Sequence, residues 1–313
     1  MAGRVPIAQR GPGWTYRPDM RAPTVYGLHQ AGIATPQREH VAMAAFDLDG
    51  ELRAVLERWT ALAEAAMREG ATVTIGLGAG ALPAALRPAG LRELPAFPGD
   101  ALDPELCGGD LCVLIGADAP PPDELVARFG TPRWVQRGWK GDTLGFRDGT
   151  LNLRRPRDLD RHVWVRSGER SWMVGGTFLV MRRIVVEPSW HALAQAEQEQ
   201  VIGRDKRTGA PLGRKRLYDA PHLEKLPADS HIRLAAPRSN HGAALLRRGY
   251  ATEDGLLFLA FQRDPRRQFV PIQQRLARHD ALARHTRHVA SAVFAIPPGA
   301  RAGGYVGEGL GGY

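Results

Sequence analysis

Residues 40–78 read HVAMAAFDLDGELRAVLERWTALAEAAMREGATVTIGLG, and this stretch contains three segments with different hydrophobic patterns. HVAMAAFDLDG (40–50) begins with an apolar run that is typical of a buried strand. Residues 50–70 place apolar side chains at helical spacing and end at a glycine, which predicts an amphipathic helix. ATVTIGLG (71–78) is rich in β-branched residues and predicts a second strand. The stretch therefore predicts a β-α-β unit.

The same alternation of strands and helices continues along the chain and appears again in its second half. Further strands are predicted at DLCVLIGAD (110–118), TPRWVQRGW (131–139), GTFLVMRRIVVE (176–187), LLFLAFQRD (256–264) and ASAVFAIPP (290–298). Helices are predicted in PPDELVARFG (121–130), from PSWHALAQAEQEQVIG (188–203), and over 269–285. Two βαββαβ-like units in tandem indicate an α+β fold of duplicated ferredoxin-like domains with antiparallel sheets, as in dimeric α/β barrel-like proteins.

We expect three parts of the chain: an irregular N-terminal arm (1–35), an N-terminal ferredoxin-like domain (36–150) and a C-terminal ferredoxin-like domain (151–313). The alternative is a doubly wound α/β fold, which calls for a glycine-rich turn between a strand and a helix. IGLGAGALPA (75–84) matches that turn only loosely and has no clear acidic ribose partner, so a nucleotide site is not favoured.

The composition is that of a soluble globular protein, with 313 residues, 43% hydrophobic and 24% charged. No apolar run approaches the roughly 18 residues of a membrane span, and the first twenty residues contain neither an apolar signal core nor a twin-arginine pair. We therefore expect a cytoplasmic protein without a membrane partner.

The two cysteines and the excess of arginine are the remaining informative features of the composition. Cys107 and Cys112 have neither a redox nor a zinc spacing, and no further cysteines complete a metal site, so we interpret them as reduced thiols. The net charge of +9 comes from scattered arginines without an aromatic–basic platform, which favours a solvated basic surface over nucleic-acid binding and is also compatible with an anionic small ligand.

Four features of the second half of the chain carry candidate chemistry. Asp148 lies between glycines in LGFRDGT (144–150), His231 lies in DSHIRLAAPR (229–238), and Arg247 lies in LLRRGY (245–250). The fourth feature is the run LLFLAFQRDPRRQFVPIQQRL (256–276). Each has an ordinary structural interpretation when taken alone, because Asp–Gly pairs are common in turns and most histidines are not ligands.

Taken together, these segments resemble the haem-dependent dye-decolourising peroxidases, and most closely the branch that contains the bacterial deferrochelatase/peroxidase. The resemblance covers nearly the whole chain. It runs through GIATPQREH (32–40), CGGDLCVLIGAD (107–118), LGFRDGT, WMVGGTFLVMRRI (172–184), EQEQVIGRDKRTGAPLG (197–213), DSHIRLAAPR, LLRRGY, FQRDPRRQFVPIQQRL (261–276) and VFAIPPGARAGGYVGEGL (293–310). It implies two ferredoxin-like domains with haem b (iron protoporphyrin IX) in the C-terminal one.

The resemblance also implies a role for individual residues. His231 corresponds to the proximal ligand of the haem iron, Asp148 to the distal acid–base group and Arg247 to the distal cation, which also contacts haem. The segments that line haem in the family correspond here to Gly149, Thr150 and Leu151, and to Ala236, Pro237 and Arg238. Arg238 would suit a haem propionate through a charge-assisted contact.

These residue types suit the chemistry of a peroxidase. A neutral imidazole from His231 can bind iron on one face and leave the other face open to hydrogen peroxide. A carboxylate at Asp148 can move a proton between the two peroxide oxygens, while Arg247 stabilises the developing negative charge. Because carboxylates titrate near pH ~4, and lower beside an arginine, we expect an acidic optimum.

A ligating histidine commonly donates its other ring N–H to a carboxylate. Asp264, at the end of the strand over 256–264, is the candidate for this partner of His231, and a turn aspartate before Pro265 is an equally good interpretation of it.

The leading hypothesis is a peroxidase that uses hydrogen peroxide to oxidise dyes, phenols and other small or bulky organic reductants. A haem-handling protein on the same fold, which stores haem or extracts its iron as a deferrochelatase does, is the alternative. A third hypothesis, a module without haem that binds nucleic acid through its positive charge, is disfavoured. The sequence leaves open whether the chain forms a homo-oligomer.

Overall fold

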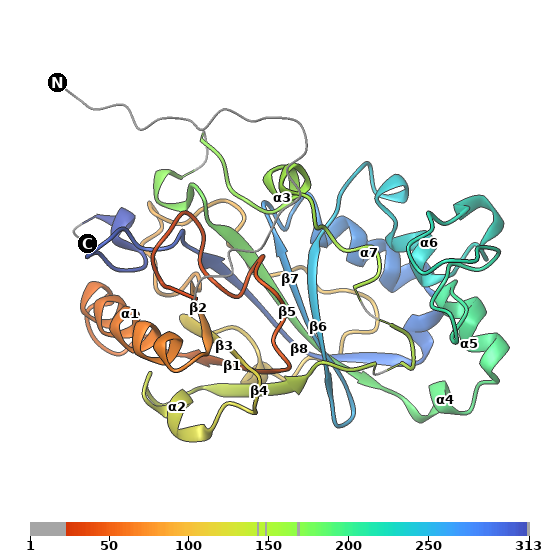
Figure 1. The fold of residues 1–313 in the computed structure, drawn as a ribbon, viewed down its shortest axis with the longest axis horizontal. Helices are drawn as coiled ribbons and strands as arrows, with labels where there is room; N and C mark the ends of the chain where they lie inside the picture. The colour runs from red at the N-terminus through yellow and green to blue at the C-terminus, as the bar shows by residue number, and fades with distance from the viewer. Residues whose placement is uncertain (1–22, 143, 148, 168–169, 312–313) are drawn as a thin grey trace.

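Each half of the chain contributes four antiparallel strands, and the eight strands close into one barrel (Figure 1). The structure is a computed structural model that describes residues 23–142, 144–147, 149–167 and 170–311. The strands are β1 (His40–Phe46), β2 (Thr72–Leu77), β3 (Leu111–Ala117), β4 (Trp134–Trp139), β5 (Thr177–Val186), β6 (Leu246–Thr252), β7 (Gly255–Gln262) and β8 (Thr286–Ile296). The α-helices are α1 (Leu52–Arg68), α2 (Asp123–Ala127), α3 (Pro156–His162), α4 (Pro188–His191), α5 (Gln195–Ile202), α6 (His231–Ala235) and α7 (Phe269–His279). Short 3₁₀ turns are η1 (Pro104–Leu106), η2 (Ser171–Met173), η3 (Leu223–Lys225), η4 (Pro237–Ser239), η5 (Ala281–Arg284) and η6 (Glu308–Leu310).

The strand order is the same in the two halves. The first half is ordered β4-β1-β3-β2. The second half, read in the corresponding direction, is ordered β8-β5-β7-β6, and both are the ferredoxin-like order. The halves meet at two short pairings, where Leu77 faces Ala295 between β2 and β8 and Trp139 faces Ala251 between β4 and β6. The predicted α+β fold of duplicated ferredoxin-like units is therefore confirmed.

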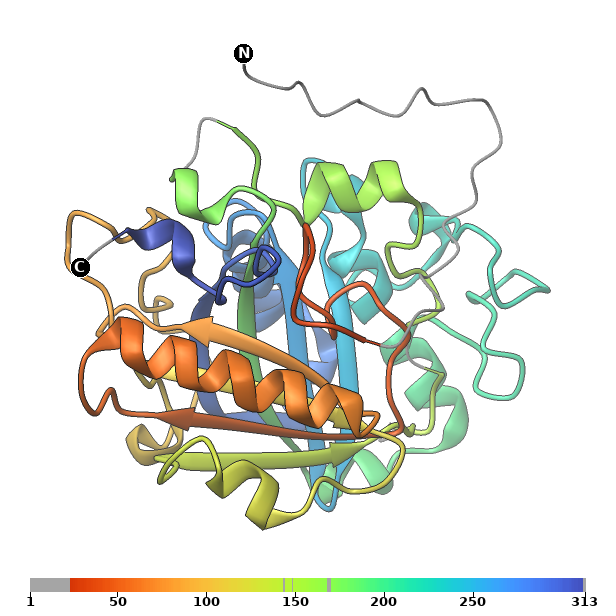
Figure 2. The same cartoon turned by 60° about the vertical axis from the view of Figure 1, so that its left-hand side comes forward.

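The barrel interior is filled by side chains from both halves. Met43 and Leu114 of the first half and Leu179, Met181 and Phe261 of the second half share one buried cluster. A separate cluster packs α1 against the outer face of β1, β2 and β3, and Figure 2 shows this helix lying along those strands. Because the interior is packed with apolar side chains, a ligand site has to lie outside the barrel.

The outer face of the second-half strands is the face that points toward the C-terminal helices. Successive side chains of a strand point to opposite faces, so Val180 points outward where Leu179 and Met181 point inward. Val180 packs there with Phe269 of α7 and Phe258 of β7. Helices α4, α5 and α6 gather at this end of the molecule, away from α1 and α2 (Figure 1).

Two predicted helices differ from what the sequence indicates: one is interrupted and the other ends earlier. The helix expected from Pro188 is split into α4 and α5. The Gln198 side chain donates a hydrogen bond to the Trp190 carbonyl near the end of α4. The Glu197 carboxylate accepts from the backbone N–H of Ala194, the residue that caps the start of α5. The helix predicted over 269–285 ends at His279, since the next residue, Asp280, has an extended backbone. Within the described residues, no helix combines the length and the apolar character needed to cross a lipid bilayer.

Candidate functional site

His231 is the first residue of α6, and a buried carboxylate fixes its ring. Its Nδ1 atom lies 2.6 Å from Oδ2 of Asp280, whose side chain is 4% exposed. The other carboxylate oxygen, Oδ1, accepts a hydrogen bond from the backbone N–H of Leu282 at 2.9 Å. Because the Asp280 carboxylate accepts a hydrogen bond from Nδ1–H, the lone pair of His231 is on Nε2, which is the arrangement of a metal-ligating histidine.

The connection between α6 and α7 holds this pair in place. Asp280 ends α7, and its backbone N–H bonds to the carbonyl of Leu276. The next residue, Ala281, donates to the carbonyl of Asp229, two residues before His231. The start of α6 and the end of α7 are thus joined through the backbone as well as through the His231–Asp280 hydrogen bond.

The prediction that Asp264 orients His231 is wrong. Asp264 forms a two-point ion pair with Arg266, with Nε–Oδ1 at 2.9 Å and Nη2–Oδ2 at 2.8 Å. It also accepts from the backbone N–H of Arg266, as a turn aspartate does. Sequence reasoning missed Asp280; the available signal was an aspartate that follows the apolar stripe of the predicted helix and precedes a second apolar segment.

Arg247 lies on β6 and points to the outer face of the sheet. Its neighbour Leu246 belongs to the barrel interior, so the Arg247 side chain points to the opposite side. The Nε atom of Arg247 is buried, and within the described residues it has no hydrogen-bond partner. This buried donor is available to a polar group of a ligand.

The segment predicted to carry the acid–base group is tied to Arg247 by Asn152. The side-chain amide of Asn152 donates to the Arg247 carbonyl at 2.7 Å, and its oxygen accepts from the Arg247 N–H at 2.9 Å. Gly149, with φ of +69°, makes the preceding turn, and its carbonyl accepts from the backbone N–H of Asn152. Asp148 itself lies outside the described residues.

The predicted lining residues fall into two groups. Thr150 is buried, whereas Leu151 is 48% exposed. Ala236, Pro237 and Arg238 follow α6 directly, and the Asn240 amide holds this turn by donating to the carbonyl of Ala236.

Arg204 is a buried cation that sequence reasoning assigned no role. It is 4% exposed and follows Gly203, the left-handed residue that ends α5. Its Nη1 atom donates to the carbonyl of Gly209 at 2.6 Å. Burial and, to a smaller extent, the nearby charge of Arg247 together lower the pKa of Arg204 to about 10.

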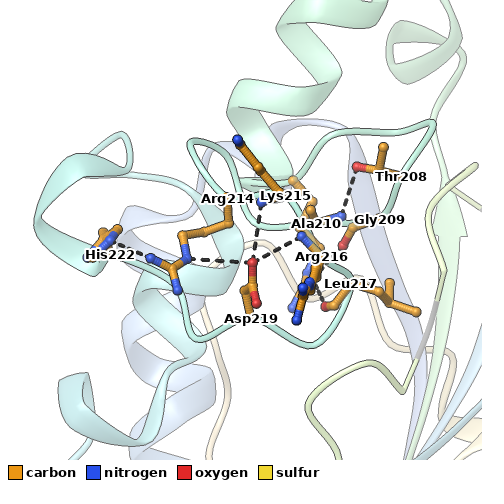
Figure 3. A network of polar contacts seen from close by, with 10 residues as sticks. Thr208, Gly209, Ala210, Arg214, Lys215, Arg216, Leu217, Asp219 and His222 are labelled. Carbon is orange, nitrogen blue, oxygen red and sulfur yellow. Dashed lines mark hydrogen bonds and ion pairs between the residues drawn. The ribbon is translucent and has the colours of Figure 1, made fainter.

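The loop over 203–222, which carries Arg204, is held by its own polar contacts (Figure 3). Asp219 accepts from the backbone N–H groups of Lys215 and Arg216, and Arg214 contacts His222. On its other side this loop packs against the segment before Asp148, because the Lys206 ammonium lies 5.6 Å from the centre of the Phe146 ring.

Comparison with known proteins identifies the family of the chain. The family profiles described as Dyp-type peroxidase, N-terminal, and Dyp-type peroxidase, C-terminal, match residues 30–121 and 140–301. A dye-decolorizing peroxidase from Thermobifida fusca (strain YX) is 35% identical, over 90% of this chain and 83% of that protein. A deferrochelatase from Escherichia coli (strain K12) is 30% identical, over 99% of this chain and 93% of that protein.

Solved structures give the same result. DtpA from Streptomyces lividans, solved in an oxyferrous complex, has a TM-score of 0.86 and 33% identity, covering 93% of this chain and 97% of that chain. A DyP-type peroxidase from Cellulomonas bogoriensis has a TM-score of 0.83 and 35% identity, covering 94% and 99%. The chain therefore belongs to the Dyp-type peroxidase family, and it is a haem-dependent peroxidase whose cofactor is haem b.

Proposed function

We propose that this peroxidase uses hydrogen peroxide to oxidise dyes, phenols and other small or bulky organic reductants, with His231 as the proximal iron ligand and Asp148 and Arg247 on the distal side. The observation that carries the proposal is the His231–Asp280 hydrogen bond of 2.6 Å. A carboxylate on Nδ1 makes the imidazole a stronger donor through Nε2, and that is the role of a proximal ligand.

The residues present fit haem b. His231 supplies its Nε2 atom, because Nδ1 is engaged by Asp280, and Arg247 supplies a buried donor, Nε, that has no partner among the described residues. Residues 151–313 would form the haem-binding domain, with Gly149, Thr150 and Leu151 from the preceding segment and Ala236, Pro237 and Arg238 after α6 lining the group. Arg238 is exposed and suits a propionate that reaches solvent.

Haem b, when bound, would supply the iron at which peroxide reacts and the two electrons that reduce peroxide, and the organic reductants would restore these electrons. The chain supplies the handling of protons and charge. Asp148 would take the proton from the inner peroxide oxygen and return it to the outer one, which leaves as water. Arg247 is permanently charged, and it would stabilise negative charge on the departing oxygen and keep Asp148 ionised. The Asn152 amide fixes the backbone of Arg247, so the cation is placed before peroxide binds.

The experiment is a comparison of haem loading and peroxide reactivity in purified variants. His231→Ala is expected to abolish stable haem loading, because it removes the axial ligand. Arg247→Leu and Asp148→Asn are expected to keep haem but to slow the reaction with hydrogen peroxide about a hundredfold or more. Arg278→Leu, an exposed arginine on α7, is the matched control and should leave the rate unchanged.

The pH profile tests the acid–base role of Asp148 separately. Oxidation of an anthraquinone dye and of a phenol should both be fastest at acidic pH, and Asp148→Asn should remove that dependence. A single maximum at or above neutral pH, or full haem loading in His231→Ala, would contradict the assigned roles.

A second candidate function is haem handling, in which iron is extracted from haem or haem is stored. The observation that favours it is the 30% identity to a deferrochelatase over 99% of this chain. Incubation of the haem-loaded protein with a reductant and an iron chelator would then release iron and leave fluorescent protoporphyrin IX. Peroxide-dependent dye oxidation without porphyrin fluorescence would favour the peroxidase alone.

A further inference from the structure

Arg204 is a cation held in the protein interior by neutral groups. Its Nη1 atom donates to the carbonyls of Gly209 at 2.6 Å and Leu217 at 3.4 Å. Carbonyl oxygens satisfy the hydrogen-bonding capacity of a guanidinium but do not neutralise its charge, so the electrostatic cost of burying Arg204 is not offset by these contacts.

The nearest charged neighbour of Arg204 makes this cost larger. Arg247 carries the same charge and lies close enough to act electrostatically on Arg204. Within the part of the chain that the structure describes, neither arginine forms an ion pair with a carboxylate, and the buried Nε of Arg247 has no hydrogen-bond partner. Arg204 is buried and Arg247 is partly buried, so their like charges cost stability that an anionic group bound beside them would offset.

The loop that carries Arg204 contacts both the proximal and the distal side of the site. On the proximal side, Gly203 packs so closely on α6 that an added Cβ atom would lie 2.7 Å from Cγ1 of Ile232, the neighbour of His231. On the distal side, Lys206 lies over Phe146, and Gly209 packs beside Arg147. A flat ligand held between these two sides would present its edge to this loop.

The position of Arg204 is set before a ligand binds. Asp205 accepts hydrogen bonds from the backbone N–H of Thr208 at 2.6 Å and from its hydroxyl at 2.7 Å, and its own N–H donates to the carbonyl of Ala210. The rest of the loop is closed by the Asp219 network in Figure 3. A guanidinium fixed in this way binds an anion without the entropic cost of ordering a mobile side chain.

We propose that Arg204 binds a propionate carboxylate of haem b at the edge of the porphyrin, beside Arg247. The inference rests on the proposed ligation of haem by His231, and it adds a residue to the binding site. The propionate would supply the negative charge that the two arginines lack, so haem binding relieves their repulsion. Arg204 would then be a cofactor-binding residue that selects for a porphyrin with free carboxylates.

The test compares two ferric porphyrins that differ only at the propionates. The apoprotein is titrated with haem b and with its dimethyl ester, in which both carboxylates are esterified, and the Soret band gives each dissociation constant. We expect wild type to prefer haem b. Arg204→Gln should weaken haem b binding about tenfold to a hundredfold and leave ester binding nearly unchanged. The control Arg207→Gln, at an exposed arginine of the same loop, should behave as wild type.

A preference for haem b that is equally large in Arg204→Gln and in wild type would overturn the inference, while the proposed function would stand. Failure of wild type to bind either porphyrin would overturn the proposed function itself. If Arg204→Gln does not fold, Arg204→Lys provides the second test, because lysine keeps the charge but loses the planar fork. Its preference for haem b should fall a few-fold, and an unchanged preference would contradict the proposal.

Discussion

Asp280 accepts a hydrogen bond from Nδ1 of His231 at 2.6 Å, and its carboxylate is buried at the end of α7. The contact joins two residues that lie 49 positions apart in the chain, and it fixes both the tautomer and the orientation of the imidazole. The candidate ligand is therefore positioned by α7 as much as by its own helix.

Asp280→Asn is expected to retain haem but to change its electronic state. An amide oxygen is a weaker hydrogen-bond acceptor than a carboxylate. The Nε2 atom of His231 therefore donates less electron density to the iron, and the ferric state is less stabilised. We expect a higher Fe(III)/Fe(II) reduction potential and a loss of about 10- to 100-fold in haem affinity or activity. Spectroelectrochemistry of the haem-loaded variant measures the potential.

Asp264→Asn is the matched control for this prediction, because Asp264 is the other carboxylate that the sequence offered as a partner. It pairs with Arg266, so its replacement should leave the haem potential unchanged. A shift in Asp264→Asn together with no shift in Asp280→Asn would mean that Asp264, and not Asp280, is the partner of His231 in the haem-loaded protein.

Asn152→Ala should impair the distal side without removing haem. The side chain of Asn152 makes two hydrogen bonds to the backbone of Arg247, so its loss frees the strand end that carries the cation. We expect a loss of about 1–2 kcal/mol in the free energy of unfolding and a peroxide reaction slowed about tenfold to a hundredfold. Chemical denaturation and stopped-flow spectroscopy measure the two effects.

Asn152→Asp separates the two hydrogen bonds, because the carboxylate still accepts from the Arg247 N–H but cannot donate to its carbonyl. An intermediate rate is expected. A rate equal to wild type in Asn152→Ala would mean that Arg247 is positioned by other contacts.

Most local elements could be predicted from the sequence, because strands such as β5 and helices such as α1 have clear hydrophobic periods of two and of 3.6, whereas β6 and α3 were missed. The closure of the barrel could not, since it depends on single pairings such as Leu77 with Ala295 and Trp139 with Ala251, which leave no local pattern. The resemblance selected His231 and Arg247 by motif. Asp280 and Arg204 were missed because their roles depend on contacts between distant segments.

Arg182→Met is expected to destabilise the contact between the two halves of the chain. Arg182 on β5 is 1% exposed and forms an ion pair with Asp100, which belongs to the loop before β3. Its guanidinium also lies 5.4 Å from the centre of the Phe97 ring. Removing one partner leaves a buried charge, which costs about 3–5 kcal/mol. Urea denaturation measures this loss.

The double variant Arg182→Met/Asp100→Leu should recover most of that stability, because it removes both charges together. The control is Arg183→Met on the same strand, whose partner Asp254 is 56% exposed, and it should cost less than about 1 kcal/mol. An equal cost for Arg182→Met and Arg183→Met would contradict the assignment of Arg182–Asp100 as a buried pair.

His288, next to the same ion pair, should make the fold less stable at acidic pH. Burial lowers its pKa to about 3, and the charge of Arg182 acts in the same direction, although the Asp100 carboxylate lies 3.7 Å from its Nδ1 atom. In the unfolded chain an ordinary histidine has a pKa of about 6.5. Between these two pKa values the unfolded state binds the proton and the folded state does not, so the contribution of His288 is fully present above pH ~6.5 and is lost progressively toward pH ~3.

The measurement is the free energy of unfolding of the haem-loaded protein at pH 7 and pH 5, for wild type and for His288→Gln. Other groups that titrate in this range are common to both proteins, so the difference between them isolates His288. The free energy of unfolding of wild type should fall by about 2 kcal/mol more than that of the variant over this interval. The reason is that the unfolded state takes up one more proton than the folded state, which costs about 1.4 kcal/mol per pH unit. Equal losses would mean that His288 titrates normally in the folded protein. If the difference is found, His288→Gln should stabilise the fold in the acidic range where the peroxidase activity is expected to be highest.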